Sequence, residues 1–291
     1  MKKIAAFLTI TAFLAPFSFA DTTQDANKGF DIAANASGTA TVNVPVEAND
    51  TPEIKSVSIN KNMQIIAMTK HEKDEQLPYN IDYTYPQITG ESLSASALEF
   101  NRLVTDMVNT SVQQFKNYVK ADMLHMQTLP DSVKHNTFTM NYVVDVIKPA
   151  NQILISVRLA IEGLQAGRAH PYHTNQILNY DLSKKKVLSL KDIFKPGAKY
   201  LNEFAKYSNT ELGKKLEDKW MLKDGTAPLL KNYQLWNLQN DGILITFAEY
   251  QVAPYASGAQ EVKIPYSNLK KLIAPNAAIA ACAKDVTGCK G

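Results

Sequence analysis

The chain of 291 residues contains only two cysteines, Cys282 and Cys289, and no histidine lies near them. Because a zinc site needs about four ligands, the pair does not predict a metal centre. In an oxidising compartment, two neighbouring cysteines most simply form a disulfide that closes a short loop. Free thiols and intermolecular bridges are the alternatives.

Beyond residue 20 the sequence also lacks a long apolar run. The longest candidate, residues 272–283, is short and is interrupted by Pro275 and Asn276. A helix that spans a bilayer needs about 20 apolar residues. We therefore expect no transmembrane anchor after the N-terminal segment.

A strong charge of either sign is missing as well. The formal net charge is +3, and removal of Lys2 and Lys3 with an N-terminal leader would lower it to +1. A nucleic-acid-binding protein would show a basic face, so nothing here indicates a nucleic-acid partner.

The common signatures of nucleophilic catalysis are also absent. There is no G-x-S-x-G elbow, and neither cysteine has a histidine close in sequence. Paired catalytic carboxylates stay possible, but nothing favours one pair over another. The sequence therefore favours a protein that is not an enzyme, and it predicts no cofactor.

Residues 1–20 have the three-part layout of a secretory signal peptide. A basic start precedes an apolar stretch from Ile4 to about Pro16, and small residues stand at Ser18 and Ala20. This is the pattern that a signal peptidase recognises. We expect cleavage near Ala20 and a periplasmic or secreted protein.

Composition divides the rest of the chain into four expected segments. Residues 21–55 are rich in Ala, Asn, Thr and Asp, bury too little to offset the entropy of ordering, and predict a flexible leader. An N-terminal α+β module is expected over 56–150 and a C-terminal α+β domain over 151–274. The tail, 275–291, carries the two cysteines.

The first module begins with two strand patterns. An apolar run at 62–69 precedes the charged segment HEKDEQ (71–76), which predicts a turn. Alternation at period two then predicts a strand over 79–85, with tyrosines on the core face and Pro86 as its end.

From about Ser92 the apolar period becomes helical, and Ser96 with Glu99 predicts a capping box. Two long alternating runs, 137–147 and 152–162, then predict a hairpin. The elements expected after it are strands at 174–182, 187–190 and 261–266, helices at 198–219 and 267–273, and a hairpin of 233–238 with 243–247. Strands and helices that do not alternate regularly favour an α+β fold, with antiparallel sheets and packed helices in two successive modules.

Three stretches of the second half, 163–194, 241–258 and 261–272, resemble a known family. It is the RsiV/PdaC-type extracytoplasmic domain of unknown function, to which the C-terminal domain of a lysozyme-sensing anti-sigma factor belongs. The matching motif elements are Gly167, His170, Pro171, Tyr180-Asp181-Leu182, Tyr250, Pro254-Tyr255 and Gly258. The IDYTYPQITG run and the following helix with Asn101 are similar to its companion N-terminal module.

His170 and His173 form an H-x-x-H spacing in a loop. Zinc would need further ligands, and the nearest acids, Glu162, Asp181 and Asp192, have no motif spacing. We therefore predict no metal site. We expect His170 to hydrogen-bond neighbouring backbone and fix its loop, with contact to a ligand as the alternative.

The segment EYQVAPYASG places two tyrosines around Pro254. Tyrosines stack on sugar rings or anchor a protein partner, and loops at strand ends often bind ligands, although a structural turn is equally consistent. The candidate ligand-binding residues are His170, Pro171, His173, Glu249, Tyr250, Tyr255 and Gly258.

The resemblance implies an exported, non-enzymatic cell-envelope protein that binds a lytic enzyme such as lysozyme, or a peptidoglycan fragment. The alternatives are a peptidoglycan hydrolase or deacetylase, and a structural envelope protein with a protein partner. Lysozymes are often basic, so a near-neutral chain needs a local acidic patch for electrostatic complementarity.

Overall fold

The computed structural model describes residues 56–284 and residue 289. The predicted signal peptide, all of the predicted leader and residues 285–288, 290 and 291 of the predicted tail lie outside these residues. The described residues fall in the unit from Pro52 to Gly291. None of their helices is both long and apolar enough to cross a membrane.

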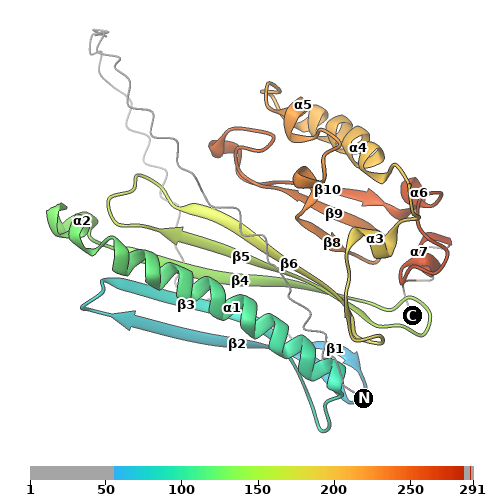
Figure 1. Cartoon of the computed structure of the whole chain (residues 1–291), viewed down its shortest axis with the longest axis horizontal. Helices are drawn as coiled ribbons and strands as arrows, with labels where there is room; N and C mark the ends of the chain where they lie inside the picture. The colour runs from blue at the N-terminus through green and yellow to red at the C-terminus, as the bar shows by residue number, and fades with distance from the viewer. Residues whose placement is uncertain (1–55, 285–288, 290–291) are drawn as a thin grey trace, which may run out of the picture. The chain divides into compact units, whose positions relative to one another are not determined.

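Seven strands form one sheet in the order of the sequence (Figure 1). They are β1 Val57–Asn60, β2 Met63–Asp74, β3 Tyr79–Gly90, β4 Asn136–Ile147, β5 Leu154–Leu164, β6 Tyr172–Asp181 and β7 Lys186–Val187. Neighbours are antiparallel except β3 and β4, which run parallel. A parallel pair needs a crossover connection, and helix α1 provides it.

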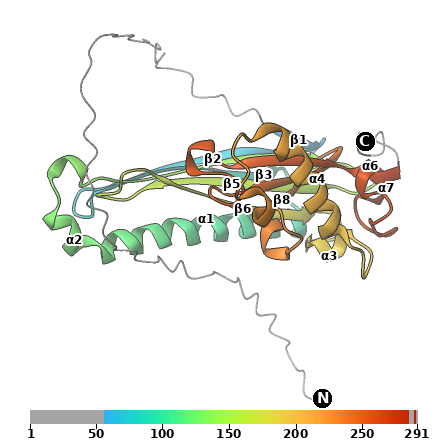
Figure 2. The same cartoon turned by 90° about the horizontal axis from the view of Figure 1, so that it is seen from above.

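Helix α1, Ala95–Ala121, lies along one face of this sheet (Figure 2). Its apolar stripe is buried as the three-and-four spacing predicted, and it includes Ala97, Phe100, Val104, Val108, Val112, Phe115 and Val119. The predicted capping box is wrong, because the N-cap is Ser94, whose hydroxyl accepts from the Ala97 N–H. The hydroxyl of Ser96 instead donates to the carbonyl of Leu182 at 2.6 Å and ties the helix to the sheet.

Two predicted strand ends are also wrong. β2 continues through the charged residues 71–74, because partners on β3 and α1 satisfy two of them. His71 contacts Asp82 of β3 at 2.5 Å, and Glu72 accepts from Tyr83 of β3 and pairs with Lys116 of α1. β3 continues past Pro86 to Gly90. Its parallel pairing with β4 stops at Tyr83, so Pro86 lies where β3 has only one paired neighbour, which tolerates a residue without an N–H.

The tyrosines of β3, Tyr79, Tyr83 and Tyr85, are buried with α1 in the core of the large sheet, as expected. Short helices α2, Met123–Thr128, and η1, Asp131–Val133, lead from α1 to β4. The predicted hairpin is confirmed, since β4 and β5 pair along their length from Thr137 with Leu164 to Ile147 with Leu154. The boundary expected between residues 150 and 151 lies in the turn of this hairpin, inside one sheet.

The rest of the chain builds a second, three-stranded sheet in the order β10-β9-β8, covered by helices. Its elements are α3 Leu190–Ile193, α4 Tyr200–Lys215, α5 Leu222–Gly225, η2 Leu230–Tyr233, β8 Trp236–Leu238, β9 Gly242–Phe247, η3 Tyr255–Ser257, β10 Gln260–Pro265, α6 Tyr266–Leu269 and α7 Ala280–Lys284. The predicted strand at 187–190 stops at Val187, because Asp192 accepts from Ser189 and starts α3 there. The fold is α+β, as predicted.

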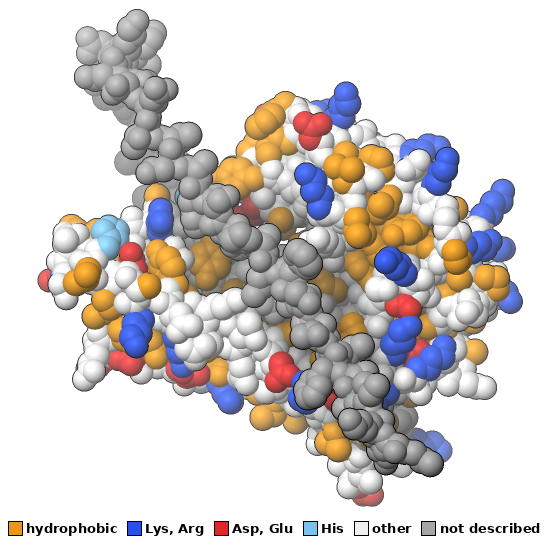
Figure 3. All heavy atoms as spheres, viewed as in Figure 1, with side chains coloured by type: hydrophobic (Ala, Val, Ile, Leu, Met, Phe, Trp, Pro, Cys, Tyr) orange, Lys and Arg blue, Asp and Glu red, His pale blue; other side chains and the backbone are white. Residues whose placement is uncertain are grey.

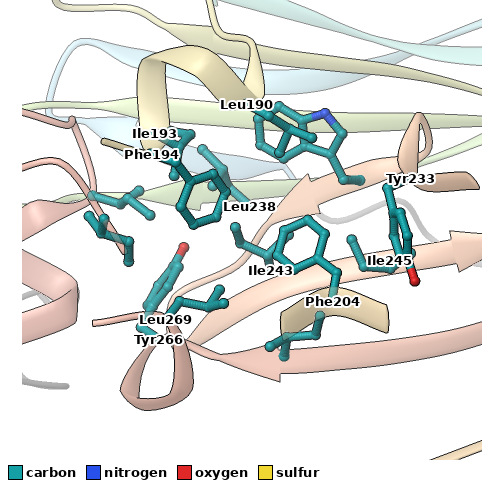
Figure 4. Packing of buried hydrophobic residues seen from close by; sticks show 14 of the residues in the cluster. Leu190, Ile193, Phe194, Phe204, Tyr233, Leu238, Ile243, Ile245, Tyr266 and Leu269 are labelled. Atoms are coloured by element: carbon teal, nitrogen blue, oxygen red, sulfur yellow. The ribbon is translucent and has the colours of Figure 1, made fainter. Parts of the chain in front are cut away.

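Aromatic and aliphatic side chains of α3, α4 and the small sheet point toward one another in a separate core (Figure 4). Phe204 of α4 lies at its centre, fully buried, with its ring 5.4 Å from that of Tyr233. Cys282 and Cys289 form a disulfide, and Cys282 is buried in the same core. The bridge therefore links α7 to residue 289, and both cysteines are buried in this core.

The two sheets are joined by buried polar side chains. Gln176 and Tyr180 of β6 contact α1, so the alternate residue Asn179 points to the opposite face of the large sheet. There its amide donates to the carbonyl of Trp236 at 2.8 Å and accepts from Ser156 at 2.7 Å. Ser156 also accepts from Asn237 at 2.8 Å. We call Ser156, Asn179 and Asn237 the joint.

Replacement of Asn179 by alanine tests the joint. The change leaves the Trp236 carbonyl and the Ser156 hydroxyl without this partner in a buried place, which costs about 2 to 4 kcal/mol for two such groups. We expect a matching loss in the free energy of unfolding measured with urea. Asn175→Ala on the same face of β6 is the control, and equal losses in both variants would contradict the role of the joint.

Candidate functional site

The predicted site residues come together where the end of the β5–β6 hairpin meets the loop after β9, residues 248–258. The group comprises Glu162 of β5, His170 and Pro171 before β6, His173 of β6, and Glu249, Tyr250 and Tyr255 of the loop. We call it the aromatic-histidine cluster. It joins two parts of the sequence about 80 residues apart.

Tyr255 is the centre of this cluster. Its ring lies 4.3 Å from that of His170 and 5.8 Å from that of Tyr250, measured between centroids. Its hydroxyl donates to the carbonyl of Pro171 at 2.9 Å. Desolvation and the neighbouring carboxylates Glu249 and Glu162 raise the pKa of Tyr255, so the hydroxyl keeps its proton and this bond.

His173 bridges two carboxylates. Its Nδ1 lies 2.7 Å from Glu249 and its Nε2 lies 3.1 Å from Glu162, which is its cross-strand partner. An imidazolium donates from both nitrogens, whereas a neutral imidazole donates from only one. The side chain of Glu249 is only 13% exposed, and a buried carboxylate is costly without a donor. The bridge therefore holds the 248–258 loop against the sheet.

His170 makes the local bond that the sequence suggested. Its Nδ1 lies 3.1 Å from the carbonyl of Pro171. The same carbonyl accepts from Tyr255, and the His170 ring lies against the Tyr255 ring at an interplanar angle of 34°. His170 thus fixes its loop and also forms part of the cluster surface.

Hydrogen bonds of the Gln251 side chain fix the 248–258 loop to neighbouring backbone. Its amide donates to the carbonyls of Gly225 and Asn232 at 3.1 and 3.0 Å and accepts from the Ala248 N–H at 3.1 Å. Tyr250 adopts the left-handed conformation, with φ of 62°, and its side chain is turned outward, with 56% of the residue exposed. This conformation is uncommon for a residue with a side chain.

Gly258 contributes geometry and not contact. It ends the η3 turn with φ of 63°, and its N–H donates to the carbonyl of Tyr255 at 2.8 Å. A side chain added there would meet no atom within 4 Å. A glycine is favoured at this position because it adopts a positive φ at no steric cost.

Glu162 is the member that the sequence did not place in the site. The sequence identified it only as an acid close to the histidines. Its distance from His173 along the chain does not indicate that the two residues lie directly opposite each other on neighbouring strands. Only the pairing register of β5 with β6 reveals this. In the part of the chain that the structure describes, no group of three or more His, Cys, Asp or Glu side chains is arranged to hold a metal ion.

The cluster is an open surface. Tyr250, His170 and His173 are exposed. Two hollows of the described residues lie elsewhere, one lined by Asn60 and Ser94 and one by Asp145 and Asn240. Lys and Arg side chains are conspicuous over the helices of the small sheet (Figure 3). The cluster itself carries two carboxylates, those of Glu162 and Glu249.

Comparison with known proteins identifies relatives. Residues 191–267 match DUF3298, a protein family of unknown function. The chain is 30% identical over 200 residues to the peptidoglycan-N-acetylmuramic acid deacetylase PdaC of Bacillus subtilis, and the match covers 67% of this chain and 39% of the deacetylase. It is 25% identical over 212 residues to the anti-sigma-V factor RsiV of the same organism, covering 70% of this chain and 68% of that factor.

A crystal structure of a DUF3298 family member from Bacteroides fragilis has a similar fold. It is 18% identical, aligns with a TM-score of 0.55, and covers 77% of this chain and 99% of that chain. The chain spans about two fifths of the length of the deacetylase. The likeness to the solved structure concerns the fold alone.

The close contact between Gly225 and the Gln251 backbone predicts that adding one methyl group at position 225 destabilises the fold. In Gly225→Ala the new Cβ would lie 1.9 Å from the Gln251 carbonyl oxygen, and backbone on both sides must shift, at a cost of about 1 to 3 kcal/mol. Gly213→Ala in α4 is the control, since its Cβ meets only Leu222 at 3.7 Å and alanine favours a helix by up to about 1 kcal/mol. Thermal unfolding should separate the two variants in opposite directions; a Gly225→Ala protein as stable as the wild type would contradict this packing.

Proposed function

Because this chain carries a DUF3298 domain, we propose that it is an exported, non-enzymatic cell-envelope protein that binds a basic lytic enzyme of the lysozyme type through the aromatic-histidine cluster. The observation that supports this most is the exposed ring of Tyr250 beside Tyr255, on a loop fastened at both sides. Large, stiff aromatic side chains of this kind anchor protein partners.

The charge of the cluster supports a basic partner. Glu162 and Glu249 carry two negative charges, which His173 offsets only in part when it is protonated. Complementary charge increases the association rate and disfavours unsuitable partners. The near-neutral chain offers no general attraction, so this local pair would supply it.

The fixed position of the loop also favours binding. Gln251 and the His173 bridge hold the loop before any partner arrives. A surface that is ordered in advance loses less conformational entropy on association. The exposed tyrosines would therefore meet a folded partner with little rearrangement.

The names of two relatives support a location in the cell envelope. The deacetylase is named for peptidoglycan, and the anti-sigma factor is matched over most of its length. For the latter, the resemblance seen in the sequence implies recognition of lysozyme. We propose that this chain binds the same kind of partner.

A peptidoglycan fragment is the second candidate ligand. The adjacent rings of Tyr250, Tyr255 and His170 favour it, because aromatic faces stack on sugar rings. Muropeptides carry carboxylates, however, which Glu162 and Glu249 would repel. The two ligands should therefore differ in salt dependence: added salt weakens binding of a basic enzyme and does not weaken binding of an acidic fragment.

Substitution of the exposed tyrosine tests the site. Tyr250→Ala should weaken binding of hen egg-white lysozyme at least 10-fold, because truncation of a central anchor costs about 2 kcal/mol or more. Isothermal titration calorimetry gives the affinity. Trp220→Ala is the control, since Trp220 is 71% exposed and lies outside the cluster. Retention of neither lysozyme nor purified peptidoglycan by the wild type would refute the proposal.

Removal of one carboxylate tests the electrostatics. Glu162→Gln should lower the association rate of lysozyme several-fold at low ionic strength, and the difference from the wild type should shrink as salt screens the charge. Stopped-flow or surface plasmon resonance over a salt series measures this. Glu91→Gln provides an exposed acid outside the cluster for comparison. Identical rates for Glu162→Gln and the wild type at every salt concentration would exclude the acidic pair as the source of attraction.

A further inference from the structure

We infer that the outer edge of β6, from His173 to Ile177, is a docking site for an extended, basic peptide segment, which joins the large sheet as an added strand. The inference extends the proposed function and depends on it only for the protein that supplies the segment. The edge lies directly beside the aromatic-histidine cluster.

The pairing of β6 shows which backbone groups face outward. Inside the sheet, the Leu182 N–H donates to the Ile153 carbonyl, so the even residues of β6 bond to β5. On the other side, the Leu188 N–H donates to the Asn179 carbonyl. Because N–H and C=O of one residue point the same way in an antiparallel ladder, the odd residues face outward.

Within the described part of the chain, the two ends of this edge are occupied and its middle has no hydrogen-bond partner. The outward carbonyl of Asn179 accepts from Leu188 at 2.8 Å, and that of Pro171 accepts from Tyr255 at 2.9 Å. Among the described residues, none hydrogen-bonds to the outward backbone groups of His173, Asn175 and Ile177. The free stretch of five residues is about 17 Å long at about 3.3 Å per residue.

This stretch lacks the features that usually protect an edge strand. Natural edges carry lysines, prolines or bulges that prevent further pairing, whereas residues 173–177 read HTNQI and pair with β5 without interruption. His173 and Thr174 are exposed, and the other three residues are half-buried. β7 pairs only with Tyr180 and Asp181, and no other strand of residues 56–284 pairs with the rest of this edge.

The side chains beside the edge select a basic occupant. His173 points to the face that carries Glu162 and Glu249. A Lys or Arg side chain at that end of an added strand would reach these carboxylates and the Tyr255 ring, gaining a charge-assisted hydrogen bond and a cation–π contact. The backbone of the segment would supply the remaining affinity, as in other cases of strand addition.

Amide exchange read by NMR tests the edge directly. In the free, full-length mature protein, the amides of His173, Asn175 and Ile177 should exchange rapidly, whereas those of Thr174, Gln176 and Leu178 should be protected. The probe is the peptide acetyl-Thr-Lys-Thr-Lys-Thr-Val-Thr-amide. It should slow exchange at the three outward amides at least 10-fold at saturation, and the same peptide with Glu in place of Lys should bind at least 5-fold more weakly.

A proline on the edge is the matched variant. In Asn175→Pro the lost N–H points away from β5, so the ladder stays intact, whereas Asn175→Ala keeps the N–H. We expect the proline variant to lose peptide and lysozyme affinity at least 10-fold and the alanine variant to stay within 2-fold. If the proline variant does not fold, the exchange measurement on the wild type decides by itself.

Each other outcome has a defined meaning. Slow exchange of the three amides in the free protein would overturn the inference, because it would show that a second copy or the chain's own N-terminal segment covers the edge. Unchanged exchange with the Lys peptide would also overturn it. Lysozyme binding that Asn175→Pro leaves unaltered refutes the inference while the proposed function stands. Peptide protection without lysozyme binding refutes the proposed partner while the inference stands.

Discussion

The position of the 248–258 loop relative to the β5–β6 hairpin depends on the buried joint of Ser156, Asn179 and Asn237 between the two sheets. These groups satisfy one another across the interface, and hydrogen bonds of this kind are directional. An apolar contact would allow the small sheet to slide, whereas the joint fixes β8 against β5 and β6. Since β9 pairs with β8, the loop after β9 is then placed at the end of the β5–β6 hairpin.

The aromatic-histidine cluster forms at the place where this loop meets the β5–β6 hairpin. Its carboxylates come from two different parts of the chain, and His173 holds them together. The same arrangement that fixes the loop leaves Tyr250 exposed and the β6 edge open. A folded partner could therefore use the tyrosines, the carboxylates and the edge at once, which would give a small site both affinity and orientation.

The comparisons and the structure divide the chain differently. The family match starts at residue 191, and residues 191–267 contain the small sheet with helices α4 and α5. Four of the seven cluster residues, however, lie on β5, β6 and the loop between them, which precede the matched residues. The site is thus built from the matched domain and the sheet before it, and neither part contains it alone.

The sequence by itself determined the elements with strong local periodicity, the α+β class and the resemblance to the family. Helix α1 and the β4–β5 hairpin were predictable, because burial on one face imposes a repeat that neighbouring residues share. The sequence also identified His170 and Tyr255 as candidate ligand-binding residues. The ends of β2 and β3, the Ser94 cap, the role of Glu162 and the free edge of β6 were decided only by tertiary structure. Each depends on a partner distant in sequence, and the spacing of residues along a chain carries no information about strand register or about which backbone groups remain unpaired.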